Sequence, residues 1–334
     1  MRTPEGAGFR MIAEGVRLLV LIGACFWLPA VYSEQGIPYV LRFASPDPFV
    51  WRDSANFYLV TTNQRGQNVP LFRSVDLQDW TPLGDALPDL PDWAKKGFTW
   101  APEIIRYQGS YWLFYTSRMR NSGFPCIGLA RAATPQGPYH DDSEAPMICM
   151  DDQGGAIDAS PFLDNGKLYI LWKANGNRLR IKTTIMLAEI DPIQRVLKSD
   201  PATLIENDAE WEGKSVEAPS LIKYDGRYYL FYSGAMFHTR KYAVGYASAD
   251  SINGPYFKYR GNPIISSNHQ RIAPGHQSIF KDGEDRYWIA YHAYPGQITG
   301  RKRTTEFARL LPPKDNWQWP GEDGWKVLPP SYAH

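Results

Sequence analysis

The stretch Ala218-Pro219-Ser220-Leu221-Ile222 leads through a turn at Asp225-Gly226 into the aromatic run Arg227-Tyr228-Tyr229-Leu230-Phe231-Tyr232. An apolar stretch, an Asp-Gly turn and an aromatic run together are typical of a β-hairpin, because Asp-Gly suits the tight turns that reverse a chain between two strands. Aromatic side chains also fill sheets well. The segment therefore predicts two neighbouring antiparallel strands.

The same pattern occurs five times along the 334 residues of the chain. The residues equivalent to Pro219 are Pro48, Pro102, Pro161 and Gln277, and the successive intervals are 54, 59, 58 and 58 residues. Repeats of this size with about four strands each have the dimensions of propeller blades. The sequence thus predicts an all-β, five-bladed β-propeller as the single domain of residues 34–334. A pair of β-sandwiches would not give one constant period.

The amino terminus has the pattern of a secretory signal. Residues 18–30 are apolar and follow Arg10 and Arg17, and Val31 and Ser33 place small residues where a signal peptidase cuts. This predicts a signal peptide over residues 1–33 and a secreted protein, extracellular or periplasmic. A retained membrane anchor is the lesser alternative, because the apolar run is shorter than the about 20 residues that a spanning helix needs.

The composition excludes some partners. The formal charge of the chain is +1, and it becomes zero without residues 1–33, so no basic surface for nucleic acid or an anionic membrane is expected. Aromatic residues make up 14% of the chain. They have a structural explanation in sheet packing and a functional one in stacking on sugar rings.

Only two cysteines follow residue 33, Cys126 and Cys149. In an exported protein they favour one disulfide across a loop, and two unpaired buried thiols are the alternative. No cysteine-based zinc site is available.

The head of each repeat carries a residue with functional chemistry. In a propeller the innermost strands begin at one face of the central channel, so their first residues converge on the axis. These residues are Asp47, Trp100, Asp158, Glu217 and His276. Three acids held close together cannot all ionise freely, so at least one pKa should rise while the others remain charged. That separation is what acid/base hydrolysis of an acetal requires.

Each of these residues also has a structural explanation. Asp47-Pro48 could be an ordinary turn, Asp158 could bind backbone amides, Glu217 could be a paired structural acid, and a lone His276 is more often a core side chain than a ligand. Three acids at equivalent places in separate repeats favour the functional interpretation.

With these motifs the chain resembles glycoside hydrolase family 43, whose members are five-bladed propellers that act on arabinose- and xylose-containing polysaccharides. The likeness runs from about Phe43 to Trp325. It rests on the ordered set Ser45-Pro46-Asp47-Pro48, Thr99-Trp100-Ala101-Pro102-Glu103, Ile157-Asp158-Ala159-Ser160-Pro161-Phe162, Val216-Glu217-Ala218-Pro219 and Gly275-His276-Gln277-Ser278.

The resemblance implies an inverting mechanism with Asp47 as general base on water and Glu217 as general acid. Asp158 would orient Glu217 and keep its pKa high. Trp100 would form a wall of the sugar subsite. The implied mechanism requires no cofactor. The resemblance also places His276 at the channel centre, where some relatives hold a structural calcium ion or a water cluster.

The segment Gly300-Arg301-Lys302-Arg303 resembles the part of the family that supplies a sugar-binding arginine. Arg303 is the preferred residue and Arg301 the second choice. Either could instead be a solvated cation of a turn. The span between the two cysteines is also similar to a paired set in relatives, which favours the disulfide.

The stretch from Leu171 to Asn177 resembles family members that remove terminal α-L-arabinofuranosyl units, although an acid often stands at the place of Asn175. The expected substrate is a plant cell-wall polysaccharide or oligosaccharide containing arabinose or xylose. A β-xylosidase, an endo-arabinanase and a non-catalytic carbohydrate-binding propeller remain alternatives. Loops such as 118–125 and 236–241 would decide between exo and endo cleavage.

Overall fold

The computed structural model describes residues 39–296, 298, 302–313 and 324–328. The expected signal segment and Arg301 lie outside these residues. Within these ranges, none of the helices has the length and apolar character needed to span a membrane.

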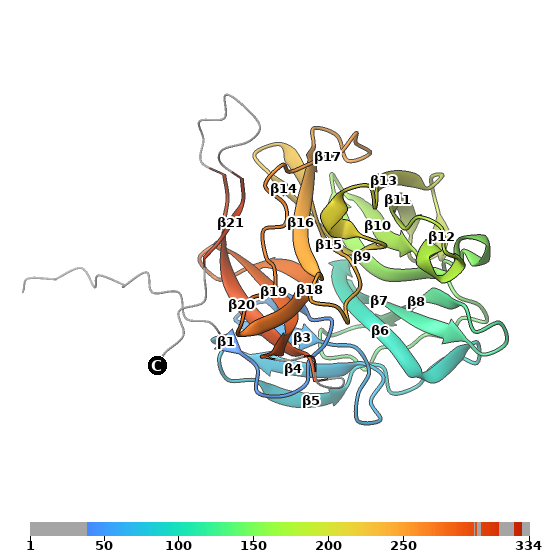
Figure 1. The fold of residues 1–334 in the computed structure, drawn as a ribbon. Helices are drawn as coiled ribbons and strands as arrows, with labels where there is room; N and C mark the ends of the chain where they lie inside the picture. The colour runs from blue at the N-terminus through green and yellow to red at the C-terminus, as the bar shows by residue number, and fades with distance from the viewer. Residues whose placement is uncertain (1–38, 297, 299–301, 314–323, 329–334) are drawn as a thin grey trace, which may run out of the picture. The chain divides into compact units, whose positions relative to one another are not determined.

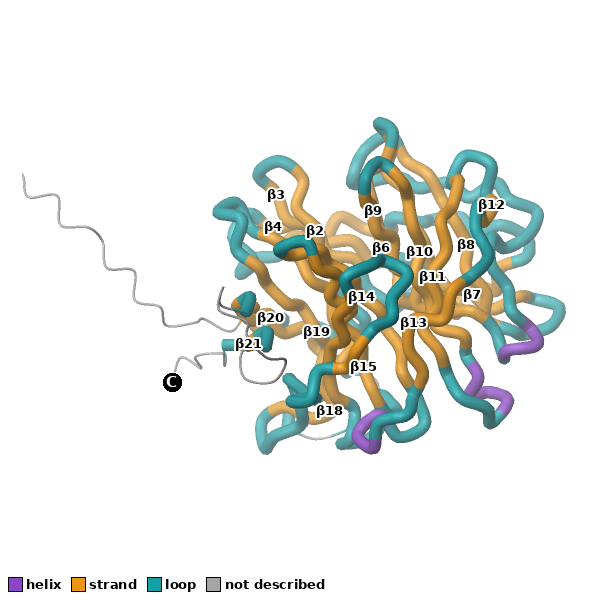
Figure 2. The backbone as a smooth tube through the Cα atoms, turned by 90° about the horizontal axis from the view of Figure 1, so that it is seen from above, coloured by secondary structure: helices purple, strands orange, loops and turns teal. Residues whose placement is uncertain are grey.

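Five antiparallel sheets, one for each sequence repeat, are arranged as the blades of a propeller (Figures 1 and 2). Blade 1 contains β2 (Phe49–Asp53), β3 (Asn56–Val60), β4 (Pro70–Ser74) and β5 (Thr81–Asp85). Blade 2 contains β6 (Ala94–Tyr107), β7 (Ser110–Met119) and β8 (Pro125–Ala132). Blade 3 contains β9 (Ala156–Asp164), β10 (Lys167–Ala174) and β11 (Thr184–Asp191), with β12 (Val196–Leu197) and β13 (Ala202–Glu206) both paired to β11.

Blade 4 contains β14 (Val216–Tyr224), β15 (Arg227–Gly234), β16 (Ala243–Ala249) and β17 (Phe257–Lys258). Blade 5 contains β18 (Arg271–Lys281), β19 (Tyr287–Pro295), β20 (Thr304–Leu311), β1 (Tyr39–Val40) and β21 (Lys326–Val327). The 3-10 helices η1 (Asp151–Gln153), η2 (Gly176–Leu179) and η3 (Glu210–Glu212) lie between strands. The prediction of an all-β five-bladed propeller is confirmed, although the sheet of blade 2 has three strands rather than four.

The last blade contains strands from both ends of the described chain. β1 pairs antiparallel with β20, with Tyr39 opposite Phe307. This pairing closes the ring, which leaves fewer unpaired strand edges at the junction of the first and last repeats.

The inner hairpins follow from the turn residues. Gln108-Gly109, Asn165-Gly166 and Asp225-Gly226 each have two consecutive positive φ angles, between 46° and 78°. Two positive φ angles define the type I′ turn, whose twist matches that of the flanking strands, and a glycine at the second position adopts it without steric cost. These turns fix the register that brings each inner strand to the same face of the ring.

Aromatic side chains fill the contacts between blades. Trp172, Tyr115, Tyr232 and Phe307 are each less than 2% exposed. One core cluster joins Val60 of blade 1 to Leu113 and Tyr115 of blade 2, and the corresponding clusters join the other neighbours. The high aromatic content therefore has a mainly structural role, and the stacked blades provide a rigid frame for the residues at the channel mouth.

Candidate active site

The backbone turns into the left-handed region at the head of every blade. Five residues without the freedom of glycine share this conformation, with φ between 43° and 58°: Asp47, Ala101, Asp158, Ala218 and His276. Each costs about 1–3 kcal/mol and persists only where the surrounding structure fixes it. The kinks recur at the motifs on which the family resemblance rests.

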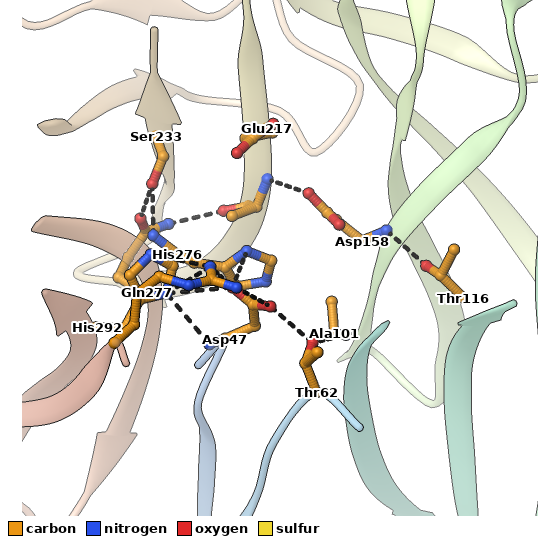
Figure 3. A network of polar contacts seen from close by, with 12 residues as sticks. Asp47, Thr62, Ala101, Thr116, Asp158, Glu217, Ser233, His276, Gln277 and His292 are labelled. Atoms are coloured by element: carbon orange, nitrogen blue, oxygen red, sulfur yellow. Dashed lines mark hydrogen bonds and ion pairs between the residues drawn. The ribbon is translucent and has the colours of Figure 1, made fainter. Parts of the chain in front are cut away.

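A side chain from the preceding blade holds four of these kinks. Ala101 donates its amide N–H to Thr62 Oγ1 at 2.9 Å, and Asp158 donates its own to Thr116 Oγ1 at 3.1 Å. The same bond joins His276 N to Ser233 Oγ (2.8 Å) and Asp47 N to His292 Nδ1 (3.1 Å). Figure 3 shows these contacts. Each of these four hydrogen bonds fixes the first residues of one blade to the second strand of the preceding blade or to the residues just after it.

The fourth blade is held differently. The amide of Ala218, next to Glu217, donates to Asp158 Oδ2 at 3.0 Å. Asp158 therefore reaches from blade 3 to the residue that follows the expected general acid. Figure 3 shows Asp47, Asp158 and Glu217, which come from three blades, together with His276 in this network.

Asp47 is held as a carboxylate. Arg303 Nη1 donates to its Oδ1 at 2.7 Å, Thr62 donates to its Oδ2 at 2.6 Å, and His276 Nδ1 lies 3.4 Å from Oδ1. Burial alone would raise the pKa of Asp47, but the Arg303 guanidinium and then His276 outweigh it and hold this pKa well below its usual range. Asp47 therefore stays ionised at any ordinary pH.

Asp158 has the opposite character. Burial raises the pKa of its carboxyl to about 6; His276 acts against this rise, and the nearby Glu217 charge adds to it. Asp158 therefore exchanges a proton close to neutral pH, as expected for one member of a group of three crowded acids.

Glu217 differs from the expectation. Tyr242 donates its hydroxyl to Oε1 at 2.8 Å and Lys173 Nζ donates to Oε2 at 2.8 Å. Burial favours a higher pKa for Glu217, but the charge and hydrogen bond of Lys173, with that of Tyr242, lower the pKa below its ordinary value. The predicted high pKa thus belongs to Asp158 in the free protein, because the ammonium of Lys173 touches Glu217.

Arg303 and His292 lie beside Asp47. Arg303 lies on the segment leading into β20 and packs its guanidinium over the ring of Phe237, 4.8 Å from the ring centroid. Phe237 belongs to loop 236–241, so this loop lies beside the acids. His292 is buried, and burial together with the Arg303 charge lowers the pKa of His292 to about 3, which makes it a neutral partner.

Trp100 lies on β6, one residue before Ala101. Its ring is partly buried and packs edge-on against Phe98, with the ring centroids 6.1 Å apart. The guanidinium of Arg118 lies 5.1 Å from the Trp100 ring centroid. Hydrogen bonds from the Ala101 amide to Thr62 and from Thr62 to Asp47 link the backbone next to Trp100 to the acids.

The surroundings of His276 do not fit a calcium cage. Calcium takes six to eight oxygen ligands. The carboxylate oxygen beside His276 is Asp47 Oδ1, which already binds the cation Arg303. Among the described residues, no three His, Cys, Asp or Glu side chains gather around His276 closely enough to share an ion.

Cys126 and Cys149 are joined by a disulfide. The bond connects the start of β8 to the loop that precedes η1 and β9. It thereby ties blade 2 to the segment that leads to Asp158.

Several residues of the site were missed from the sequence. Five of them occupy equivalent places in the repeats, one or two residues after the aromatic run of the second strand: Thr62, Thr116, Lys173, Ser233 and His292. Extending the repeat by one or two residues would have found them. Tyr242 and Phe237 lie between β15 and β16, where no repeat pattern marks them.

Comparison with known proteins agrees with this geometry. The model described as glycosyl hydrolases family 43 matches residues 38–318. The extracellular exo-alpha-(1->5)-L-arabinofuranosidase ArbA of Cellvibrio japonicus is 23% identical, over 84% of each chain. A beta-xylosidase of Bacillus subtilis is 28% identical over 78% of this chain, which spans about half (49%) of that protein. The crystal structure of a thermostable family-43 glycoside hydrolase is 29% identical, with a TM-score of 0.77 and coverage of 90% of this chain and 96% of the other.

Proposed function

The chain belongs to glycosyl hydrolase family 43 and is a glycosidase, and we propose that it removes terminal α-L-arabinofuranosyl residues from arabinan- or arabinoxylan-type polysaccharides with inversion at the anomeric carbon. The observation that carries this proposal is that three buried acids lie together and differ in their protonation. Arg303 holds Asp47 ionised, and burial raises the pKa of Asp158 to about 6. Glu217 is bonded by Lys173 and Tyr242.

In the proposed reaction Asp47 takes a proton from a water molecule as the water oxygen forms a bond to the anomeric carbon. The bond from that carbon to the leaving oxygen breaks, and Glu217 donates its proton to this oxygen. Asp158 orients Glu217 through the amide of Ala218. Arg303 keeps Asp47 ionised, and Trp100, His276 and Arg303 would contact the sugar.

The choice of arabinose rests on two supports. The match to ArbA covers most of both chains, and the segment from Leu171 to Asn177 resembles the arabinofuranosidase type. A β-xylosidase is the second candidate, because the beta-xylosidase of Bacillus subtilis has a higher identity than ArbA, 28% against 23%. The match to that xylosidase covers a smaller share of its length, 49% against 84%.

The proposal is tested by comparing hydrolysis of aryl α-L-arabinofuranoside and aryl β-D-xyloside, with NMR detection of the first-formed sugar. We expect faster release from the arabinofuranoside and β-L-arabinofuranose as the first product. Faster release from the xyloside would replace the sugar assignment. A first product with the substrate's own configuration would exclude the inverting mechanism, and no hydrolysis at all would favour the non-catalytic alternative.

The pH dependence of kcat/KM is expected to follow the same groups. The pair formed by Asp158 and Glu217 must carry one proton, and this proton is lost as the pH rises through about 6, so activity should fall on the alkaline side of that value. Asp47 must be ionised, so the acidic decline should lie below the ordinary carboxyl range. A profile measured at constant ionic strength checks this, and activity that still increases above about pH 8 would contradict it.

We also propose that the protein is exported. The signal pattern of residues 1–33 and the Cys126–Cys149 disulfide support this, because disulfides persist in oxidising compartments. The similarity to ArbA, which is named as extracellular, is a further support. Fractionation of the producing cells with immunodetection of the cleaved form tests it.

A further inference from the structure

One of the five blades departs from the hydrogen-bonding pattern that the other four share. One or two residues after the aromatic run of the second strand, four blades carry a side chain that accepts the amide N–H of the next blade's head: Thr62, Thr116, Ser233 and His292. In blade 3 the equivalent residue is Lys173 at the end of β10. A lysine ammonium has three donors and no acceptor. Lys173 therefore cannot hold the head of blade 4 as the others hold theirs.

The exception has two consequences in the structure. The amide of Ala218, left without its usual partner, donates to Asp158 Oδ2 instead. The ammonium of Lys173 turns to Glu217 and donates to Oε2 at 2.8 Å. The lysine at this one position thus leaves the amide next to Glu217 to bond Asp158, and it places a cation on the carboxylate of Glu217.

Burial makes this contact strong. The side chain of Lys173 is 2% exposed and that of Glu217 is 12% exposed. A charged lysine is stable at such a depth when its charge is paired, because removing an ion from water is strongly unfavourable. A surface ion pair of the same kind contributes little.

The other groups that face Glu217 act differently. Tyr242, from the segment before β16, donates to Oε1 and stays neutral because burial raises its pKa. Asp158 on β9 is an acid whose negative charge opposes that of Glu217. His276 on β18 lies beside Asp47 and also lowers the pKa of Glu217, by less than Lys173 and Tyr242 do. Lys173 is therefore the group that pairs a positive charge directly with the carboxylate.

We propose that Lys173 is a positioning residue for the general acid, which anchors Glu217 through Oε2 and sets the pH range in which the Asp158–Glu217 pair retains its catalytic proton. This inference rests on the proposed function, since it assigns Lys173 to the acid of that reaction. Lys173 itself transfers no group to the sugar.

The test compares three variants by the pH profile of kcat/KM. Lys173→Thr inserts the side chain that blades 1 and 2 carry at this place, so it supplies an acceptor for Ala218 and is expected to fold. Lys173→Met keeps the length without the charge, and Lys173→Arg keeps the charge. We expect the alkaline decline to move upward by about 1–3 pH units in the Thr and Met variants, because an adjacent cation lowers a carboxyl pKa by about that amount. The Arg variant should keep the wild-type position.

Lys167→Met is the matched control. Lys167 lies on the same strand and also bonds a glutamate, Glu189, at 2.8 Å, but its side chain is 58% exposed. Its removal should leave the profile unchanged. An alkaline decline that stays in place in both the Thr and Met variants, or that moves downward, overturns the proposal, and so does an equal upward movement in Lys167→Met.

A titration followed by carboxyl ¹³C NMR gives a readout that needs no activity. The two signals are assigned with the Glu217→Gln and Asp158→Asn variants. In the wild-type protein Glu217 should titrate below Asp158, and in Lys173→Thr the Glu217 titration should move upward. The reverse order in the wild type, or no movement in the variant, overturns the role of Lys173. The expected order in a protein that hydrolyses no glycoside would instead reject the proposed function and leave the Lys173–Glu217 assignment intact.

Discussion

Replacement of Asp47 by asparagine is expected to lower kcat/KM by about 10²- to 10⁴-fold, the range that general acid–base catalysis usually supplies. The loss should be similar for substrates with good and with poor leaving groups, because activation of water is needed whichever bond breaks. Steady-state kinetics on a pair of aryl arabinofuranosides that differ in leaving group measure this loss.

The fold should survive this change. Asparagine keeps an oxygen for the 2.7 Å bond from Arg303 and retains the volume of the buried side chain. Circular dichroism and a cooperative thermal melt check that the loss is chemical. Asp53→Asn serves as the matched control, because Asp53 ends the strand β2 that Asp47 precedes and bonds Tyr111 away from the channel mouth. An Asp47→Asn enzyme with wild-type activity would remove Asp47 from the mechanism.

The repeat explains why so much of the site could be predicted from the sequence. Hairpins with fixed turns bring each inner strand back to the same face, so equivalent residues of successive repeats, about 58 positions apart in the chain, lie close together in space. Asp47, Asp158 and Glu217 could be assigned to one site for that reason alone. The resemblance to the family then added Arg303, whose place after the fifth hairpin has no counterpart in the other repeats.

The protonation of the acids could not be predicted in the same way. Repulsion and burial predict that one of three acids holds a proton, but which one depends on contacts of a few ångströms. Lys173 touches Glu217 and not Asp158 in the hydrogen bonds of the structure, and this contact decides the assignment. Tyr242 comes from a connection between strands, where neither alternation nor the repeat constrains the side chain.

The second large effect is expected for Glu217→Gln, and it should depend on the leaving group. Hydrolysis of arabinan or of an alkyl arabinofuranoside should fall by about 10²- to 10⁴-fold, because these leaving oxygens need a proton as the bond breaks. An aryl arabinofuranoside with a strongly acidic phenol needs little protonation and should lose far less. Glutamine keeps an oxygen that can accept from Lys173 but removes the negative charge opposite the buried ammonium, so a cooperative thermal melt checks that the variant is folded.

The comparison with Asp158→Asn decides which acid donates the proton. If Glu217 is the donor, its variant shows the strong dependence on the leaving group and loses the alkaline decline of the pH profile, whereas Asp158→Asn lowers the rate on good and poor leaving groups alike. If the two patterns are exchanged, Asp158, whose pKa lies at about 6, is the donor and the ion pair of Lys173 with Glu217 is the structural element beside it. Because the apparent pKa values of two coupled carboxyl groups belong to the pair, the pH profile alone does not identify the proton donor, and the leaving-group test does.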